Sequence, residues 1–314
     1  MFLRMITKKE TLTQNITYMA IMAGVNAVFS LIAVFFPILS VFLMIILPLT
    51  STIVFLFTKH KYFFIYAFAT IALCLLITMW DMSFTIFYIV PSIITGYLFG
   101  IFLKHQIQSI WIIFITSIVQ ALFYTLTIPL VNFIFEVDLV KVFLSAFLLN
   151  ESVHIFVIIP SFFFLLALIQ MSFSHLIIAN EINKFGYELN EEKININLFS
   201  ILNIVFLLLI IPFIFFYPSA SYLFLIISFY FAFYLLFNST SFRKYALLII
   251  YCFVGFLFIF LFAFLFPLIE APFGLLILSF IPLSITIVSF INNLLLKRHL
   301  KDKMNNTMEK EEDA

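Results

Sequence analysis

Long hydrophobic runs dominate the chain, and short polar segments separate them. Each run has about 20 residues, which is enough for a helix to cross a hydrocarbon core about 30 Å thick. A transmembrane barrel would instead show alternating hydrophobic and polar residues. The pattern predicts an all-α polytopic membrane protein with about ten transmembrane helices, at 16–36, 38–57, 62–80, 84–103, 110–135, 153–178, 196–216, 220–237, 245–266 and 273–296.

Two junctions between neighbouring runs contain a proline and almost no polar residue. They lie at Pro37 and Pro218. Proline cannot continue the hydrogen-bond pattern of a helix, so it ends or bends one. Each junction therefore predicts either a hairpin with its turn near the membrane surface or one long bent helix.

A single long polar stretch interrupts the hydrophobic pattern, at 180–195, and it carries six charged residues. Such a composition is typical of a solvated connector. We therefore expect an N-terminal six-helix bundle at 1–179, a cytoplasmic connector at 180–195, a four-span bundle at 196–296 and a charged cytoplasmic tail at 297–314.

Basic residues are concentrated in every second segment between the predicted spans. Of the 16 Lys and Arg residues, all but Lys141 fall in segments that ten spans would place on one side of the membrane. Cytoplasmic loops collect Lys and Arg, so both termini are predicted to be cytoplasmic in a multi-pass protein of a bacterial cell membrane. The formal net charge of +1 gives no reason to expect a nucleic-acid partner.

The overall composition and several missing motifs exclude common classes of function. The chain is 65% hydrophobic and 10% charged, whereas soluble domains have about 25% charged residues. No Gly-Lys dipeptide is present, so no phosphate-binding P-loop can form, and six glycines form no dinucleotide fingerprint. His-Glu-x-x-His and Gly-x-Ser-x-Gly are also missing. We expect no enzyme activity, no cofactor and no ATP hydrolysis by this chain.

Candidate ligand-binding residues lie at the predicted outer start of the sixth span. Glu151 and His154 are three residues apart, so they share a helix face and can hold a cationic or hydrogen-bonding ligand. The alternative is an interfacial helix cap, in which Asn150 or Ser152 caps the helix. No metal site is expected, because the second Glu-x-x-His copy of di-iron bundles is missing.

Four further polar or aromatic residues can face the same outer cavity. Trp80 and Asp81 end the third span, where an interfacial anchor and a solvated loop residue are the alternative reading. Gln120 and Asn132 lie in the fifth span, where interhelical hydrogen bonds are the alternative. The predicted ligand-binding set is therefore Glu151, His154, Asp81, Trp80, Asn132 and Gln120.

Four histidines lie away from the predicted outer ligand-binding residues. His60, His105, His175 and His299 lie near predicted cytoplasmic helix ends, beside basic or polar residues. We expect these four side chains to be solvated.

Small residues mark two predicted helix contacts. Gly96 and Gly100 form a G-x-x-x-G motif, which lets two helices in lipid pack closely. The first span carries a flank of small residues that suits the approach of a partner helix, from this chain or another: Ala20, Ala23, Gly24 and Ala27.

The segment 17–27, Thr-Tyr-Met-Ala-Ile-Met-Ala-Gly-Val-Asn-Ala, is followed by the proline junction and by Leu47-Pro48-Leu49. Together they resemble the YybS-like family of uncharacterised bacterial membrane proteins. That family is in turn similar to the substrate-binding S components of energy-coupling factor transporters, over residues 1 to about 180.

The resemblance to S components implies a ligand held between the outer helix ends and loops. It also implies that Ala20, Ala23, Gly24 and Ala27 dock on a transmembrane coupling subunit, with ATPases on other chains. The four C-terminal spans depart from an ordinary S component and can cover this docking surface.

Two functions follow from the sequence. The first is a substrate-binding, transport-related module without its own ATPase. The second is a non-transporting membrane scaffold or envelope-biogenesis factor that works through the connector and the charged tail. An intramembrane enzyme has less support, because one acid and one imidazole on a helix face are too few for a catalytic assignment.

Overall fold

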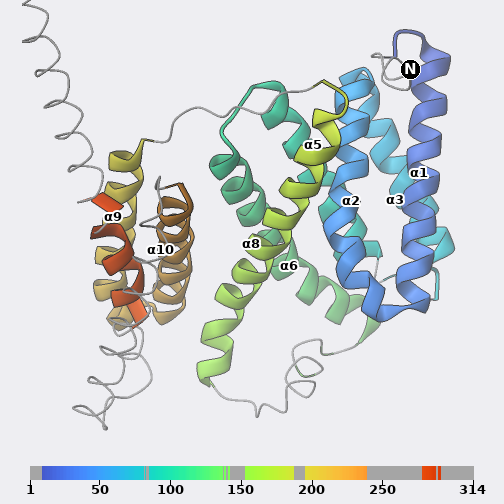
Figure 1. The fold of residues 1–314 in the computed structure, drawn as a ribbon. Coiled ribbons are helices and arrows are strands. Elements are labelled where there is room, and N and C mark those ends of the chain that lie inside the picture. The colour runs from blue at the N-terminus through green and yellow to red at the C-terminus, as the bar shows by residue number, and fades with distance from the viewer. Residues whose placement is uncertain are drawn as a thin grey trace, which may run out of the picture. The chain divides into compact units, whose positions relative to one another are not determined.

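The computed structural model describes residues 9–80, 82, 85–136, 138, 141, 153–186, 195–238, 278–287 and 289–290 (Figure 1). All regular secondary structure in these residues is helical. Seven helices are long and apolar enough to cross a membrane, at Leu12–Phe35, His60–Ile77, Thr85–Lys104, Ser109–Ile134, Ile159–Asn183, Ile196–Phe216 and Pro218–Leu236. This confirms the all-α, multi-span class. The predicted span 245–266 and the tail 297–314 lie outside the described residues.

The chain divides into two compact units, Met1–Glu192 and Lys193–Ala314. The boundary falls within the polar segment 180–195. The first unit contains α1 (Leu12–Phe35), α2 (Pro37–Phe57), η2 (His60–Tyr62), α3 (Phe63–Ile77), η3 (Thr85–Ile89), α5 (Val90–Lys104), α6 (Ser109–Phe135) and α8 (Val153–Asn183). The second contains α9 (Ile196–Phe216), α10 (Pro218–Asn238) and a helical segment, Leu278–Ile287.

Both proline junctions are hairpins. A single residue, Phe36, separates α1 from α2, and Tyr217 separates α9 from α10. The first two helices fold back on each other, because Thr50 Oγ1 of α2 donates to Asn26 Oδ1 of α1 at 2.8 Å. Interlocking rings hold the second pair, including Phe206 and Phe224.

A buried asparagine fixes the open end of the first hairpin. Asn15 is fully buried, and its Nδ2 donates to the carbonyls of Lys9 (3.1 Å) and Thr11 (2.7 Å). Its Oδ1 accepts from the Lys59 backbone N–H at 2.8 Å. The Lys9 N–H also donates to the carbonyl of Phe57 at 2.8 Å. The residues that precede α1 are therefore tied to the end of α2.

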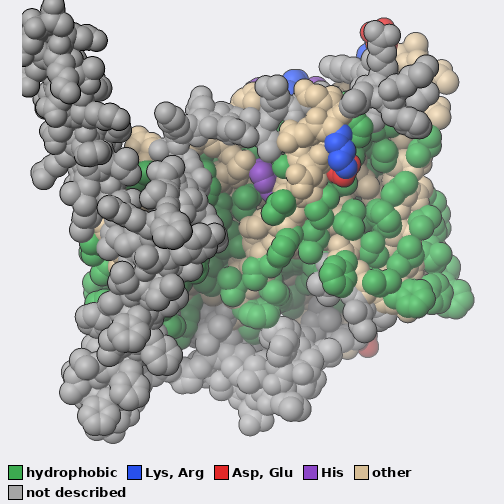
Figure 2. All heavy atoms as spheres, viewed as in Figure 1, with side chains coloured by type: hydrophobic (Ala, Val, Ile, Leu, Met, Phe, Trp, Pro, Cys, Tyr) green, Lys and Arg blue, Asp and Glu red, His purple; other side chains and the backbone are tan. Residues whose placement is uncertain are grey.

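The helices of the first unit expose hydrophobic side chains and bury polar ones. In α1 the exposed face carries Leu12, Ile16, Ile21, Val28, Leu31 and Phe35, whereas Asn15, Asn26 and Ser30 are buried. Figure 2 shows that hydrophobic side chains cover the middle of the visible helices. This distribution suits lipid, since an apolar solvent accepts an apolar outer face and polar groups must find partners inside.

All the described lysines of the first unit except Lys141 lie at one end. The helices α2, α5 and α8 run in the same direction, because Gly96 and Gly100 pack along α2 and Phe185 meets Phe57. Lysines 9, 59, 61, 104 and 184 all lie where α1 begins or where α2, α5 and α8 end. Lys141 follows α6.

The helices α2 and α5 approach each other closely at two glycines. A Cβ added at Gly96 would lie 2.4 Å from the Pro48 carbonyl oxygen and 2.6 Å from Ser51 Cβ. One added at Gly100 would lie 2.4 Å from Phe55 Cδ1. Thr52 Oγ1 adds a hydrogen bond to the Gly96 carbonyl at 3.0 Å. Gly96 therefore lets α5 approach the backbone of α2, and Gly100 leaves room for the Phe55 ring.

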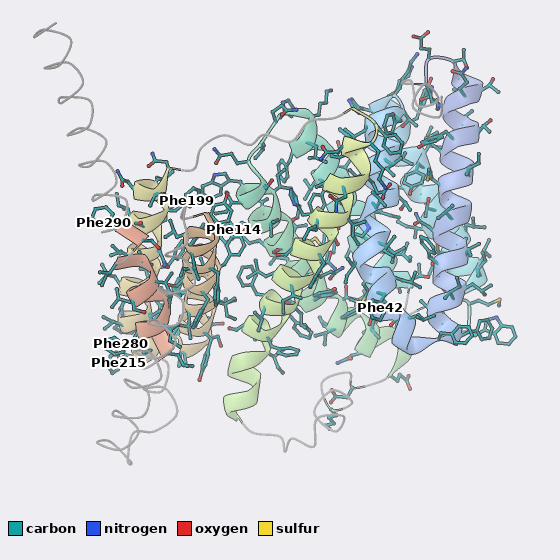
Figure 3. All side chains as sticks on the ribbon, in the orientation of Figure 1. Phe42, Phe114, Phe199, Phe215, Phe280 and Phe290 are labelled. Carbon is teal, nitrogen blue, oxygen red and sulfur yellow. The ribbon has the colours of Figure 1, made fainter. Side chains whose placement is uncertain are left out.

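The second unit is held by aromatic rings and one asparagine. Phe199 is buried between α9 and α10, with its ring centroid 5.8 Å from that of Phe231 (Figure 3). Asn203 Nδ2 of α9 donates to Thr286 Oγ1, and Ser228 Oγ of α10 donates to Asn203 Oδ1. One carboxamide thus joins three helical segments.

We expect Gly96→Ala to lower the free energy of unfolding by about 1–3 kcal/mol, because the added methyl group forces α2 and α5 apart. Gly24→Ala is the matched control, since nothing lies within 4 Å of a Cβ added there. Thermal unfolding of both variants in mild detergent tests this. Equal midpoints for the two variants would contradict the close packing at Gly96.

Candidate functional site

Polar side chains form a closed cluster between α1, α2 and α3. Asn26 Nδ2 donates to the Tyr66 hydroxyl at 2.8 Å, while Asn26 Oδ1 accepts from Thr50. The hydroxyls of Ser51 and Tyr66 are 3.4 Å apart. Because each of these four side chains has a partner, the cluster stabilises the helix packing and leaves no free group for a ligand.

A second polar region begins at a gap in the hydrogen bonding of α2. Pro48 has no N–H, so the carbonyl of Met44, four residues earlier, loses its helical donor. Gln170 of α8 supplies the missing bond, with Nε2 donating to the Met44 oxygen at 3.0 Å. Ser174 Oγ donates to the next carbonyl, that of Ile45, at 2.8 Å. The gap in α2 thereby fixes α8 against it.

The same carboxamide links α8 to α6. Gln170 is 7% exposed, and its Oε1 accepts a hydrogen bond from the Tyr124 hydroxyl. The Tyr124 ring stacks on Phe87 of η3, with centroids 5.0 Å apart, and its centroid is 6.0 Å from that of Phe163. Tyr124 and Gln170 are therefore held in place by several elements.

Gln120 lies one helical turn before Tyr124, on the same face of α6. It is fully buried, and neither its Oε1 nor its Nε2 makes a hydrogen bond of good geometry, although the amide interacts with the neighbouring Tyr124 hydroxyl. Within the described residues, no other side chain has two such buried atoms. A buried polar group without a partner costs about 1–3 kcal/mol. Such a group, offering one acceptor and two donors, is suited to bind an uncharged polar molecule.

The position of Gln120 separates it from the predicted outer cavity. It is near the middle of α6, and Asn132 follows twelve residues later. With a rise of about 1.5 Å per residue, the two lie about 18 Å apart along the helix. Asn132 is half-buried. The side-chain amides of Gln120 and Asn132 therefore lie at different depths along α6.

Most of the outer ligand set lies beyond what the structure describes. Asp81 and Glu151 are outside the described residues, and so is the side chain of His154, although its backbone belongs to α8. Trp80 follows α3 and is 91% exposed. Of the six predicted ligand residues, only Gln120 is a buried side chain in the described part of the chain.

The small-residue flank of α1 is divided between two environments. Ala23 and Ala27 are buried within the first unit. Ala20 is exposed, and a Cβ added at Gly24 would meet no atom within 4 Å. The flank therefore serves internal packing in part, and Ala20 and Gly24 face outward.

One histidine differs from its sequence prediction. His175 is only 8% exposed, its Nε2 has no hydrogen-bond partner, and its ring centroid is 6.2 Å from that of Phe99. The prediction of a solvated side chain is wrong here. The reason is that α8 continues to Asn183, beyond the predicted end of the span at 178, so His175 lies inside the helix bundle.

In the described residues, no three His, Cys, Asp or Glu side chains lie close enough to hold a metal ion. The chemistry available at Gln120, Tyr124 and Gln170 is hydrogen bonding. The fold and these side chains define a polytopic helical membrane protein with a polar interior. Comparisons of the chain with protein-family models, with curated proteins and with solved structures find no match.

We expect Gln120→Leu to raise the free energy of unfolding of the ligand-free protein by about 1 kcal/mol, because it removes two buried atoms that make no hydrogen bond of good geometry. Gln170→Leu is the matched control, and it should destabilise by about 1–3 kcal/mol because it leaves Met44 and Tyr124 unpaired. Thermal unfolding in detergent measures both. Destabilisation by Gln120→Leu as large as that by Gln170→Leu would show that Gln120 is paired.

A double-mutant cycle tests the role of Pro48. We expect Gln170→Leu to cost less in a Pro48→Ala background, because alanine returns the N–H that Met44 lacks. A coupling of about 1 kcal/mol between the two sites is expected from one hydrogen bond. Additive effects in the unfolding measurement would show that Gln170 does not compensate for the proline.

Proposed function

We propose that the protein binds a small, uncharged polar molecule at Gln120, within the first unit, and moves it across a bacterial cell membrane as a module without its own ATPase. The observation that carries this proposal is the fully buried Gln120 carboxamide, whose oxygen and nitrogen make no hydrogen bond of good geometry. In native structures such a group calls for a specific explanation, and a hydrogen-bonding ligand supplies one.

The surroundings of Gln120 support binding rather than packing alone. Tyr124, one turn away on α6, and its partner Gln170 are fixed by their own hydrogen bonds and ring contacts. Side chains that are already fixed lower the entropic cost of binding a ligand beside them. Sites near the bilayer midplane, between helices, are also typical of transporters.

The energy for transport is assigned to other chains. The sequence has no phosphate-binding motif, and its resemblance to S components favours a transmembrane coupling subunit with ATPases. Ala20 and Gly24 are the small residues of α1 that remain available for such a partner. In this proposal both termini are cytoplasmic, and Glu151 and His154 meet the ligand at the outer surface.

Mass spectrometry of small molecules that co-purify with the full-length protein in mild detergent tests the proposal. We expect one polar molecule to be enriched with the wild type and reduced about tenfold by Gln120→Leu, since two hydrogen bonds are lost. Thr70→Val is the matched control, because Thr70 is another fully buried polar side chain, on α3 and outside the Gln120 region. This variant should retain the molecule.

The alternative, a scaffold, predicts the opposite pattern. No small molecule would then be enriched, and no coupling subunit would co-purify. A cellular phenotype would be lost on deleting 305–314 and reversing the charges of the connector, but would persist in Gln120→Leu and in Glu151→Ala with His154→Ala. That combination of results would overturn the transport proposal.

A further inference from the structure

A shallow groove with charged, polar and apolar lining residues lies at the beginning of α1, separate from the Gln120 region. It has a volume of about 330 Å³ and is lined by Lys9, Thr13, Gln14, Thr17, Tyr18 and Ile21. Thr13, Gln14 and Thr17 are exposed, so their polar groups are accessible from outside the unit. The groove lies at the lysine-rich end of the first unit.

The lysine of this groove is held in place. The Lys9 backbone is tied to Phe57 and to the buried Asn15, as described above. Its Nζ lies 5.3 Å from the centroid of the Tyr18 ring. A cation at this distance is attracted by the ring face, so the ammonium group stays at the groove with its outer N–H groups free to donate. Among the residues that the structure describes, no carboxylate lines the groove.

The lining changes from charged to apolar along α1. Lys9, Thr13 and Gln14 form the part nearest the helix start, and Ile21, 57% exposed, ends the groove on the apolar outer face. Gln14 Oε1 accepts from backbone N–H groups at the cap, which leaves Nε2 as a donor. Thr13 and Ile21 are about 12 Å apart along the helix. This order matches a phospholipid, with its phosphate, its glycerol and the start of its acyl chains.

We propose that the groove binds the headgroup of an anionic phospholipid, with Lys9 on the phosphate, the Thr13 and Thr17 hydroxyls on the phosphate or glycerol oxygens, and Ile21 against the acyl chains. An anionic headgroup is favoured because the described lining has one positive charge and no negative one. The helix end also lies where headgroups gather around a membrane-spanning helix.

Native mass spectrometry of the full-length protein in detergent, with added phosphatidylglycerol or phosphatidylcholine, tests this proposal. Lys9→Gln should weaken the retention of phosphatidylglycerol about fivefold, the usual effect of one basic residue near an anionic surface. Lys61→Gln is the matched control, because Lys61 also lies over a tyrosine, Tyr62, at 4.9 Å, but does not line the groove. It should retain the lipid.

Two further variants separate the loss of specific contacts from the loss of folding. Lys9→Arg should retain phosphatidylglycerol, which separates loss of charge from loss of folding. The double variant Thr13→Val with Thr17→Val should weaken retention without changing the net charge. Equal retention of phosphatidylglycerol by Lys9→Gln and the wild type would overturn the proposal. Displacement of the lipid by millimolar inorganic phosphate would also overturn it, since the groove would then be a site for free anions.

Discussion

The hydrogen bond that Pro48 cannot make is the constraint around which the first unit is built. In a membrane interior, a backbone carbonyl without a donor has no water to replace it. Gln170 therefore has to lie beside Met44, which places α8 against α2. On the other side of the same turn, Thr52 and Gly96 bring α5 against the Pro48 carbonyl. The missing donor thus accounts for the position of α8 against α2, and the contact at Gly96 adds α5 on the other side.

This constraint also explains why two glutamines in apolar helices have different roles. The Gln170 carboxamide donates a hydrogen bond to the Met44 carbonyl and accepts one from the Tyr124 hydroxyl, so it contributes to stability. Gln120, one turn from Tyr124, makes no hydrogen bond of good geometry inside the same bundle. A protein that keeps such a group sacrifices stability at that point, and functional sites are the usual place for this exchange.

The helices could be predicted from the sequence, because a long apolar run in lipid has to satisfy its own backbone hydrogen bonds. The side-chain partners could not. Gln120 and Gln170 look alike in the sequence, and only the neighbouring helices distinguish them. Similarly, Ala23 and Gly24 are adjacent, yet helix rotation buries one and opens the other. His175 was misjudged because the end of α8 was placed five residues too early, and basic neighbours suggested solvent. The outer pair Glu151 and His154 stays a prediction.

The carboxamide that joins three segments of the second unit has a consequence for biosynthesis. Asn203 and its acceptor on Thr286 are 83 residues apart, whereas Asn26 finds Tyr66 after 40 residues. A nascent chain leaving the ribosome can therefore complete the contacts of Asn26 early. The Nδ2 group of Asn203 can meet its acceptor only after residue 286 has been translated. The contact between Asn203 and Thr286 is therefore completed later in synthesis than the contacts of Asn26, or than that of Asn203 with Ser228.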